Sequence, residues 1–325
     1  MVMNKKSVVF TLISTVLLSV ILISFLIQTN NRANVEVQKA NVEVETLNSF
    51  TKTLNEKYLP TALKLSAIQA TRSINDYIED NGIYLDVENL NDTYDELMKM
   101  GQYVEGGAGL GLVIDSDYMY YGGVNYTIGA LFEEVDNLAG LTGINFTYGD
   151  INPIKVYHEE PFTFTASVII DYNVSSNDQK TSFSYSNKEV KGKVPLYELR
   201  DPMRIIGLST NVSIIKAEHD VWDTEALEYD IINITYIDSD EAPSFLQRLT
   251  GDFSSSEYGI TSFVNTKIYS NPNLYTNVDY SYFTQDKDNN CRITELSDYP
   301  NFYLRTSHRN KYGLDDCTFD ELFEG

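Results

Sequence analysis

The sequence predicts an α+β protein in which an N-terminal transmembrane helix continues into a long stalk helix, followed by short helices and an antiparallel β-rich head. An uncharged apolar run stands near the N-terminus, helical periodicity follows it, and segments rich in β-branched and aromatic residues fill the second half. The predicted regions are a transmembrane anchor or stem at 1–30, a stalk at 31–82, a helical and glycine-rich connection at 83–143, and a β-rich extracytoplasmic domain at 144–325.

Residues 7–27 form the apolar run, which as a helix is about 30 Å long, the thickness of the hydrocarbon core of a bilayer. The run is longer than the apolar region of a cleavable signal peptide, and no small-residue cleavage site follows it. We therefore expect a single-pass membrane protein with a cytoplasmic N-terminus and an extracellular body, whose partner through residues 7–27 is the lipid bilayer. The predicted anchoring side chains are Val8, Phe10, Leu12, Leu17, Ile21 and Leu26.

The stretch Phe10-Thr11-Leu12-Ile13-Ser14 resembles the start of type IV pilins and pseudopilins. Val9 stands where that family has Gly before the peptidase cut, and Ser14 stands where it has Glu. The stretches "EAPSFLQRLTG", "YGITSFVN" and "FYLRTSHRNKYGL" are similar to parts of uncharacterised archaeal membrane-anchored surface proteins with a pilin-like start. The resemblance implies association with like subunits or with pilus and surface-assembly proteins, and it brings no catalytic residue with it.

Helical periodicity continues after the apolar run. Asn34-Val35-Glu36-Val37 recurs seven residues later as Asn41-Val42-Glu43-Val44, and apolar residues then step by three and four along one face. Pro60 is predicted to kink or split this helix, and Gly82 is predicted to end it. The face packs either between molecules or on the chain's own domain, and its predicted contacts are Val37, Val44, Leu47 and Leu54.

Two shorter helices are predicted next, at Asp86–Met100 and Ile128–Leu141, the first with an inner face of Leu90, Tyr94, Leu97 and Met98. The glycine-rich stretch 101–111 lies between them. It follows a helix rather than a strand and lacks the terminal Lys-Ser/Thr of a phosphate loop, so a simple loop is predicted.

Beyond residue 144 the pattern indicates antiparallel strands. Apolar residues alternate from Phe162 to Ile170, which predicts one sheet face in water and one packed face. A short helix, Ala242–Leu249, is expected between strands. The predicted strands are 144–150, 154–160, 162–175, 180–187, 188–197, 211–219, 229–238, 261–270 and 278–286.

Composition limits the function classes. The chain of 325 residues has 24 Lys and Arg against 47 Asp and Glu, a net charge of −23, so it repels nucleic acid and no nucleic-acid partner is expected. Its two cysteines, Cys291 and Cys317, are predicted to form a disulfide in an oxidising compartment; two unlinked buried thiols are the alternative. Sequons predict a glycoprotein with glycans at Asn91, Asn125, Asn145, Asn173, Asn211 and Asn233.

Few residues suggest a reactive or metal site. Asp286, Asp288 and Asn290 alternate as at the start of a calcium loop, but the Gly and the bidentate Glu of an EF-hand are missing. An Asp- and Asn-rich turn is the main prediction there, and calcium is the only cofactor hypothesis. The histidines have no zinc spacing and are expected in the core or in solvent: His158, His219 and His308.

The leading functional prediction is a non-enzymatic, pilin-like surface protein that acts through association of its stem and presentation of its head. The first alternative is a ligand-binding domain that captures a carbohydrate or a peptide on tyrosines such as Tyr118, Tyr120 and Tyr121. The second is an extracellular hydrolase with two carboxylates, for which Glu159 and Glu160 are one of several acidic pairs. No catalytic residue is predicted, because the chain has no Gly-x-Ser-x-Gly elbow.

Overall fold

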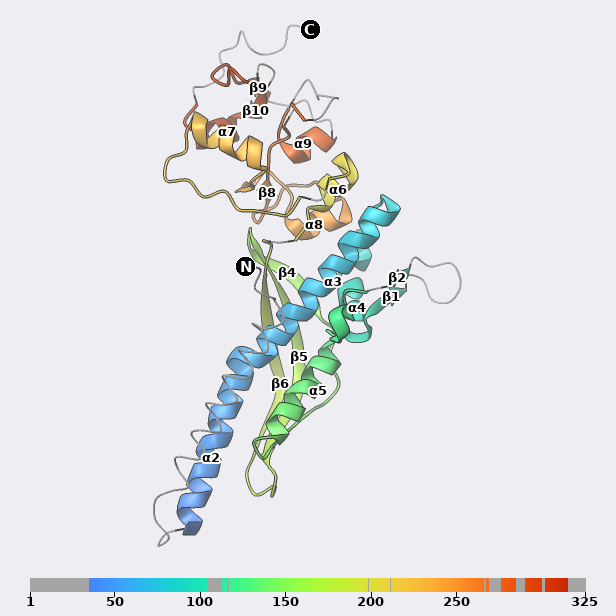
Figure 1. The fold of residues 1–325 in the computed structure, drawn as a ribbon, viewed down its shortest axis with the longest axis vertical. Coiled ribbons are helices and arrows are strands. Elements are labelled where there is room, and N and C mark those ends of the chain that lie inside the picture. Colours follow the sequence, from blue (N-terminus) through green and yellow to red (C-terminus); the bar gives the residue numbers. More distant parts are fainter. Residues whose placement is uncertain are drawn as a thin grey trace.

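The chain folds into an elongated stem and a C-terminal head, joined near the end of one long helix (Figure 1). In this computed structural model the order of the elements can be followed from residue 35 onwards. The residues that the structure describes are 35–104, 113–115, 117–197, 199–210, 212–265, 267–268, 276–284, 290–299 and 302–314.

The long helix consists of α2 (Val35–Thr53), a π-helical turn η1 (Leu54–Tyr58) and α3 (Leu59–Asn81). Pro60 lies in the first turn of α3, where its missing N–H and its ring disrupt the bond to the carbonyl four residues earlier, so a wider turn precedes it. The predicted interruption at Pro60 is confirmed. The predicted end is confirmed as well: Gly82 has a φ of +66° and its N–H donates to Ile78 O at 2.9 Å.

A four-stranded antiparallel sheet packs against this helix. Its strands are β3 (Ile144–Tyr148), β4 (Lys155–Glu160), β5 (Thr163–Ser176) and β6 (Ser182–Pro195). The long β5 pairs with β6 along one edge and with β4 and β3, one after the other, along the opposite edge.

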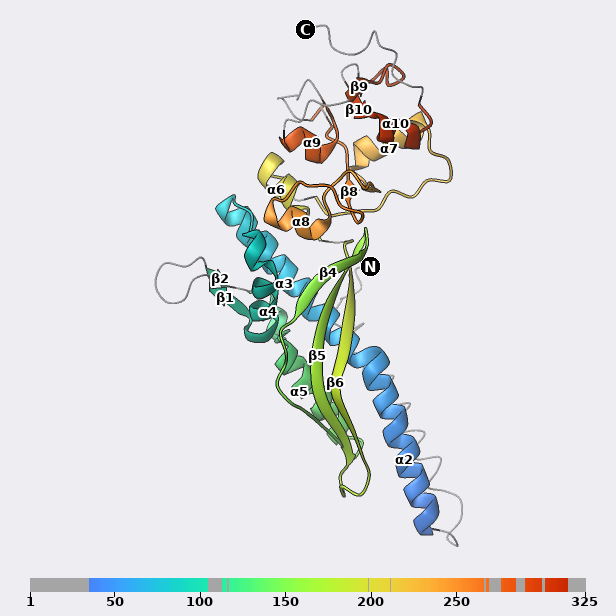
Figure 2. The ribbon, with the colours of Figure 1, turned by 180° about the vertical axis from the view of Figure 1, so that it is seen from behind.

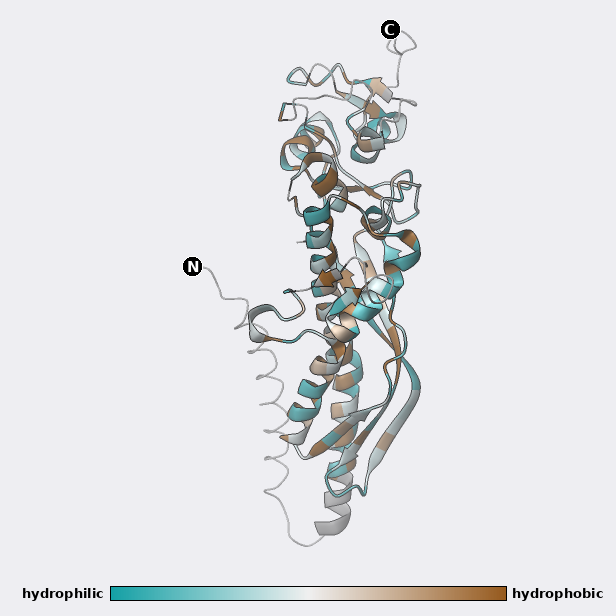
Figure 3. Cartoon of the chain, turned by 90° about the vertical axis from the view of Figure 1, so that its right-hand side faces the viewer, coloured by the Kyte–Doolittle hydropathy of each residue, from teal (hydrophilic) through white to brown (hydrophobic). Residues whose placement is uncertain are grey.

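One face of the sheet is covered by helices, and Figure 2 shows the opposite face without a helix over it. The apolar residues from Phe164 to Ile170 that alternate along β5 are buried, whereas Ile169 on the other face is 42% exposed. The predicted alternation is confirmed around Ile169 but not along the whole strand, because Thr165 and Ser167 on the same face as Ile169 are 0% and 8% exposed. Hydrophobic and hydrophilic residues intermingle along the long helix and the strands in Figure 3.

Helix and sheet approach closely at Gly192 of β6. A Cβ placed there would lie 2.7 Å from Lys64 N, 2.8 Å from Leu63 Cβ and 2.9 Å from Pro60 O. Only glycine allows this approach. Nearby, Tyr172 OH donates to Asn55 Oδ1 in the π-helical turn at 2.6 Å, which fastens the turn to β5.

Short elements connect the long helix to the sheet. They are η2 (Val87–Asn89), α4 (Leu90–Met100), the hairpin of β1 (Gln102–Val104) and β2 (Val113–Asp115), η3 (Tyr121–Gly123) and α5 (Ile128–Gly140). The two predicted helices are confirmed, and Tyr94, Leu97 and Met98 are fully buried on the inner face of α4. Most of the predicted glycine-rich loop, residues 105–112, lies outside the described residues.

The head is built from short helices and two-residue or three-residue strands. Its helices are α6 (Pro202–Leu208), α7 (Thr224–Asn233), α8 (Phe245–Thr250), α9 (Asp279–Thr284) and α10 (Thr306–Lys311), and its strands are β7 (Ile237–Asp238), β8 (Ile260–Thr261), β9 (Asn290–Arg292) and β10 (Tyr303–Arg305).

Most of the predicted strands of the head are wrong. Most of 278–286 is the helix α9, and the first half of 229–238 belongs to the helix α7. The described part of 211–219 forms only isolated bridges, and in the described part of 261–270 only Thr261 belongs to a strand, β8. The side chain of Asp223 caps α7 by accepting from Ala226 N at 3.0 Å, and the helix buries Leu227 and Ile231 on one side. The cap and this buried face outweigh the strand preference of the β-branched residues.

The predicted transmembrane helix requires a correction. Within the described ranges, no helix combines the length and the apolar composition that crossing a bilayer demands. Residues 7–27, with the predicted anchoring side chains Val8, Phe10, Leu12, Leu17, Ile21 and Leu26, lie outside the described residues. The fold class is therefore corrected to α+β with an antiparallel sheet and no described transmembrane helix, and the single-pass localisation is corrected with it.

The predicted disulfide is corrected only for the described residues: none joins two of them, because Cys317, the other cysteine of the chain, lies outside them. Cys291, on β9, is 2% exposed and is not a free thiol.

Candidate functional site

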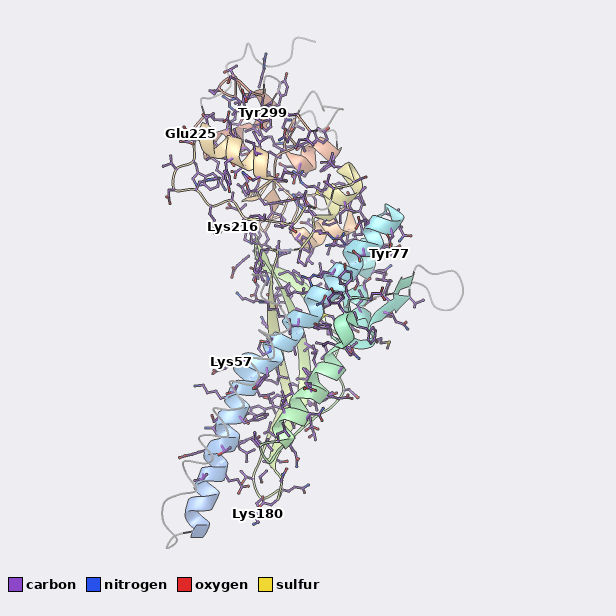
Figure 4. The ribbon with its side chains drawn as sticks, in the orientation of Figure 1. Lys57, Tyr77, Lys180, Lys216, Glu225 and Tyr299 are labelled. Atoms are coloured by element: carbon purple, nitrogen blue, oxygen red, sulfur yellow. The ribbon has the colours of Figure 1, made fainter. Side chains whose placement is uncertain are left out.

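A cavity of about 350 Å³ lies where the stem meets the head. Its walls come from the end of α3, the segment that follows it, α4, the β1–β2 hairpin and the end of α8. Figure 4 shows Tyr77, one of its lining residues, near the head end of the long helix and close to this hairpin. We call this cavity the junction pocket, and its lining residues are Tyr77, Tyr84, Leu85, Asp86, Asn89, Thr93, Tyr103, Ile114 and Thr250.

The turn after α3 positions one wall. Gly82 reverses the chain, and Leu85 N then donates to Leu249 O of α8 at 3.0 Å. Asp86 caps η2, because its Oδ1 accepts from Glu88 N at 3.1 Å. These bonds hold residues 84–86 between the long helix and the head.

Tyr84 is held by close packing on the head. Its ring lies so near Gly251, which has a φ of +67°, that a Cβ on that glycine would come within 2.6 Å of it. The ring also meets Phe253 edge to face, with centroids 5.7 Å apart. Burial, followed by the nearby Asp201 carboxylate and opposed by Arg248, raises the pKa of Tyr84 to about 12, so its hydroxyl stays protonated at neutral pH.

Tyr77 and Tyr103 supply two further aromatic walls, and each is 7% exposed. Tyr103 pairs across the hairpin with Ile114, which also lines the pocket. Thr93 is fully buried and its hydroxyl donates to Asn89 O at 2.8 Å. The pocket thus combines three aromatic and two aliphatic residues with four polar ones, and it lies at a junction between two parts of the fold, a common place for small-molecule sites.

Among the described residues that line it, the junction pocket has a single charged one. Asp86 is exposed, and none of the other lining residues is an acid, a lysine, an arginine or a histidine. The site is therefore negative at neutral pH, within a chain whose net charge is already −23.

A buried ion network lies behind Tyr84 and consists of Asp201, Arg204, Arg248 and Asp279, all fully buried. Arg248 Nη1 donates to Asp201 Oδ2 at 2.8 Å and to Asp279 Oδ2 at 3.0 Å. Arg204 joins through Ser262, whose hydroxyl donates to Asp279 Oδ2 at 2.8 Å.

The charges in this network balance each other. Burial acts to raise the pKa of Asp279, but Arg248 and the hydrogen bonds to the carboxylate lower it below its ordinary value. Burial acts to lower the pKa of Arg248, and Asp279 and Asp201 outweigh burial and raise it. Two carboxylates face two guanidinium groups, so the network adds no net charge beside the junction pocket.

The head carries a second, more open cleft of about 690 Å³. Figure 4 labels Lys216, one of its lining residues. We call it the head cleft, and it is lined by Lys216, Ala217, Glu218, His219, Asp220, Trp222, Asp238 and Lys311.

His219 has the geometry of an oriented imidazole. Its Nε2 lies 2.8 Å from Asp230 Oδ1, and Asp230 also accepts from Thr235 Oγ1 and, at 2.5 Å, from Tyr312 OH. Burial and the Asp230 charge raise the pKa of Tyr312 far above its ordinary range. The lining of the cleft includes no Ser, Thr or Cys that could act as a nucleophile, and Asp230 is occupied by structural bonds.

The other two histidines lie elsewhere. His158 Nδ1 lies 3.0 Å from Thr163 O, and its Nε2 accepts from Leu246 N at 3.3 Å, so the imidazole ties β4 and β5 to α8. His308 is 2% exposed, in α10. Among the described residues, no group of three or more His, Cys, Asp or Glu side chains is arranged to hold a metal ion.

The predicted calcium residues are not described as a site. Asp286 and Asp288 lie outside the described residues, and Asn290 begins β9 without a described side chain.

The predicted stalk contacts divide into three groups. Leu47 and Leu54 are 1% and 0% exposed and belong to the chain's own core, which is the intramolecular alternative for this face. Val44 is 42% exposed. The side chain of Val37 lies outside the described part of α2.

The sequons are spread over several elements. Asn91, Asn125 and Asn233 are exposed, and Asn145 and Asn173 are half-buried in β3 and β5. The amide of Asn91 accepts from Val156 N at 2.9 Å, and that of Asn173 accepts from Ser184 Oγ at 2.9 Å. Asn211 lies outside the described residues.

None of the junction-pocket residues was predicted from the sequence. The tyrosines proposed as a platform, Tyr118, Tyr120 and Tyr121, lie elsewhere; Tyr120 and Tyr121 are 52% and 60% exposed. The only local signal at the pocket is the Asn-Gly stop before Tyr84, which marks a turn but no ligand.

Comparison of the chain with protein-family models, with curated proteins and with solved structures found no match.

Proposed function

We propose that this protein is a non-enzymatic binding protein: the stem of long helix and sheet holds the head in place, and a small molecule binds at the junction between them. The observation that carries the proposal is the junction pocket. It is concave, is lined by three tyrosines and two aliphatic side chains, and lies between the stem and the head, a preferred location for ligand sites.

The stem supports the head through specific contacts. Asn75 Nδ2 of α3 donates to Arg200 O at 3.0 Å, and the guanidinium of Arg200 pairs with Asp76 and Glu79 on the same helix. Leu85 and Leu249 add the main-chain bond described above. These contacts fix the stem side of the pocket relative to the head side, which supports a preformed site.

The chemistry of the two sites supports a non-enzymatic role. A hydrolase with two carboxylates needs a second acid near the first, and among the described residues of the junction pocket Asp86 is the one acid. In the head cleft, the hydrogen bond from Lys311 lowers the pKa of Asp238, so this carboxyl group is ionised and does not serve as the protonated general acid.

The test is a thermal-shift screen of the purified protein against small polar and aromatic compounds, followed by titration calorimetry of each hit. We expect at least one compound to raise the melting temperature of the wild-type protein. Asn89→Trp, which places an indole at the pocket wall, should abolish that shift. Asn233→Trp is the matched control, because Asn233 is exposed on α7 and does not line the pocket. Equal shifts in both variants, or no hit in the screen, would overturn the proposal.

A further inference from the structure

We infer that the junction pocket selects a small organic cation, an alkylated ammonium, over neutral and anionic molecules of the same size. This inference rests on the proposed function and names its ligand class.

The first support is the charge of the lining. Asp86 is the only charged residue in the described part of the lining, and the ion network behind Tyr84 adds two positive and two negative charges. The described wall therefore has no basic side chain to hold a carboxylate or a phosphate. An anion would meet Asp86 without a partner, and a cation would be attracted to it.

The second support is the aromatic content of the lining. Tyr77, Tyr84 and Tyr103 come from three different segments, the helix α3, the loop after it and the strand β1, and all three line the one cavity. The face of an aromatic ring carries partial negative charge, and several such faces around one cavity are the usual means of binding an alkylated ammonium. Protonated tyrosines keep this property, and the pKa of Tyr84 is about 12.

The third support is the balance between apolar and polar surface. Leu85 and Ile114 complete the wall beside the tyrosines. A metal site usually has several charged ligands, whereas the described lining offers one carboxylate, and no described group of three or more His, Cys, Asp or Glu side chains is arranged to hold a metal ion. An alkylated ammonium has apolar methyl groups, which can pack against the tyrosines and aliphatic side chains. Its positive charge is spread over these groups and is attracted to the Asp86 carboxylate, so it fits the apolar and the charged part of the lining.

The experiment compares two probes of the same shape on the full chain. Choline carries a quaternary nitrogen, and 3,3-dimethylbutan-1-ol has carbon in its place. We expect choline to bind at least about tenfold more tightly in calorimetric titration at low salt, and its affinity alone to fall as salt is added.

Asp86→Asn tests the carboxylate. Asparagine also caps a helix start, so the variant keeps the bond to Glu88 N and removes only the charge. It should weaken choline binding several-fold and leave the binding of the neutral alcohol unchanged. Asp92→Asn is the matched control, because Asp92 is an exposed acid in the first turn of the neighbouring helix α4 and does not line the pocket.

The outcomes separate the inference from the proposed function. Equal affinity for both probes, tighter binding of the alcohol, or binding of neither probe overturns the selection of a cation. The proposed function still stands in these cases if the screen finds another ligand that Asn89→Trp excludes. Choline binding that Asn89→Trp does not affect overturns both, because the cation then binds outside the junction pocket.

Discussion

Acidification should destabilise this protein through His308 well before its carboxylates titrate. The imidazole is 2% exposed, its Nε2 has no hydrogen-bond partner among the described residues, and the ring of Phe263 meets it edge to face at 6.1 Å. Burial lowers the pKa of His308 to about 4, with Arg305 and Lys311 acting in the same direction and Asp279 against it. The folded protein therefore holds this imidazole neutral.

The sign and size of the effect follow from linkage. In the unfolded chain the pKa of histidine is about 6.5, so between about pH 6.5 and about pH 4 the unfolded state binds the extra proton. The contribution of His308 to stability is complete above that window and falls as the pH decreases through it. Between about pH 7.5 and about pH 5 the free energy of unfolding should fall by about 2 kcal/mol on this account.

The assay is urea denaturation at several pH values in that range, for the wild-type protein and for His308→Gln. Glutamine is polar and does not titrate, so the variant should lose about 2 kcal/mol less than the wild type on acidification, whatever its stability at neutral pH. The lowered pKa of His158 and the surface carboxylates affect both proteins alike and cancel in the difference. Parallel pH dependences for the two proteins would show that His308 is not kept neutral by the fold.

Two further predictions concern packing and buried charge. Gly192→Ala should lower the free energy of unfolding by about 1–3 kcal/mol in chemical denaturation, because its Cβ would meet the backbone of Lys64 and Pro60, which cannot turn aside. Gly140→Ala is the control with the opposite sign: the site is open and helical, so we expect a gain of about 0.5–1 kcal/mol. Asp279→Ala should cost about 3–5 kcal/mol, since it leaves Arg248 buried with one carboxylate fewer. Asp298→Ala, which breaks an exposed pair with Lys267, should leave the denaturation midpoint nearly unchanged, and a similar loss in both Asp variants would contradict the assigned role of burial.

The parts of the fold that were predicted correctly are those with a strong local signal. The helices at α3, α4 and α5 have apolar faces with the helical period, and Pro60 and Gly82 mark an interruption and an end by their backbone chemistry. The strands β3 to β6 combine β-branched residues with alternation. In the head, by contrast, β-branched residues occur in short helices as well, and α9 is set by packing and by the buried Asp279, neither of which has a local pattern.

The candidate site could not be predicted from local patterns, because its residues come from five separate segments. Tyr77 lies in the last turns of α3, Tyr103 belongs to a three-residue strand, and Thr250 is the last residue of α8. Each looks like an ordinary core or loop residue in the sequence, and only the tertiary arrangement brings them to one cavity. The same holds for the ion network, whose four members span residues 201 to 279.

The helix α8 connects the junction pocket to both the head and the stem. Three consecutive residues of this helix face three different structures: Arg248 enters the buried ion network, Leu249 packs in the core shared with the stem, and Thr250 lines the pocket. A ligand that binds against Thr250 therefore acts on the helix that joins head to stem. At about 100 times its Kd such a ligand would stabilise the folded protein by about 2.7 kcal/mol. Because α8 contacts both the head and the stem, binding of the ligand should slow amide exchange in the head and at the end of α3 together. Slowing confined to the pocket wall would show that α8 does not couple the head to the stem.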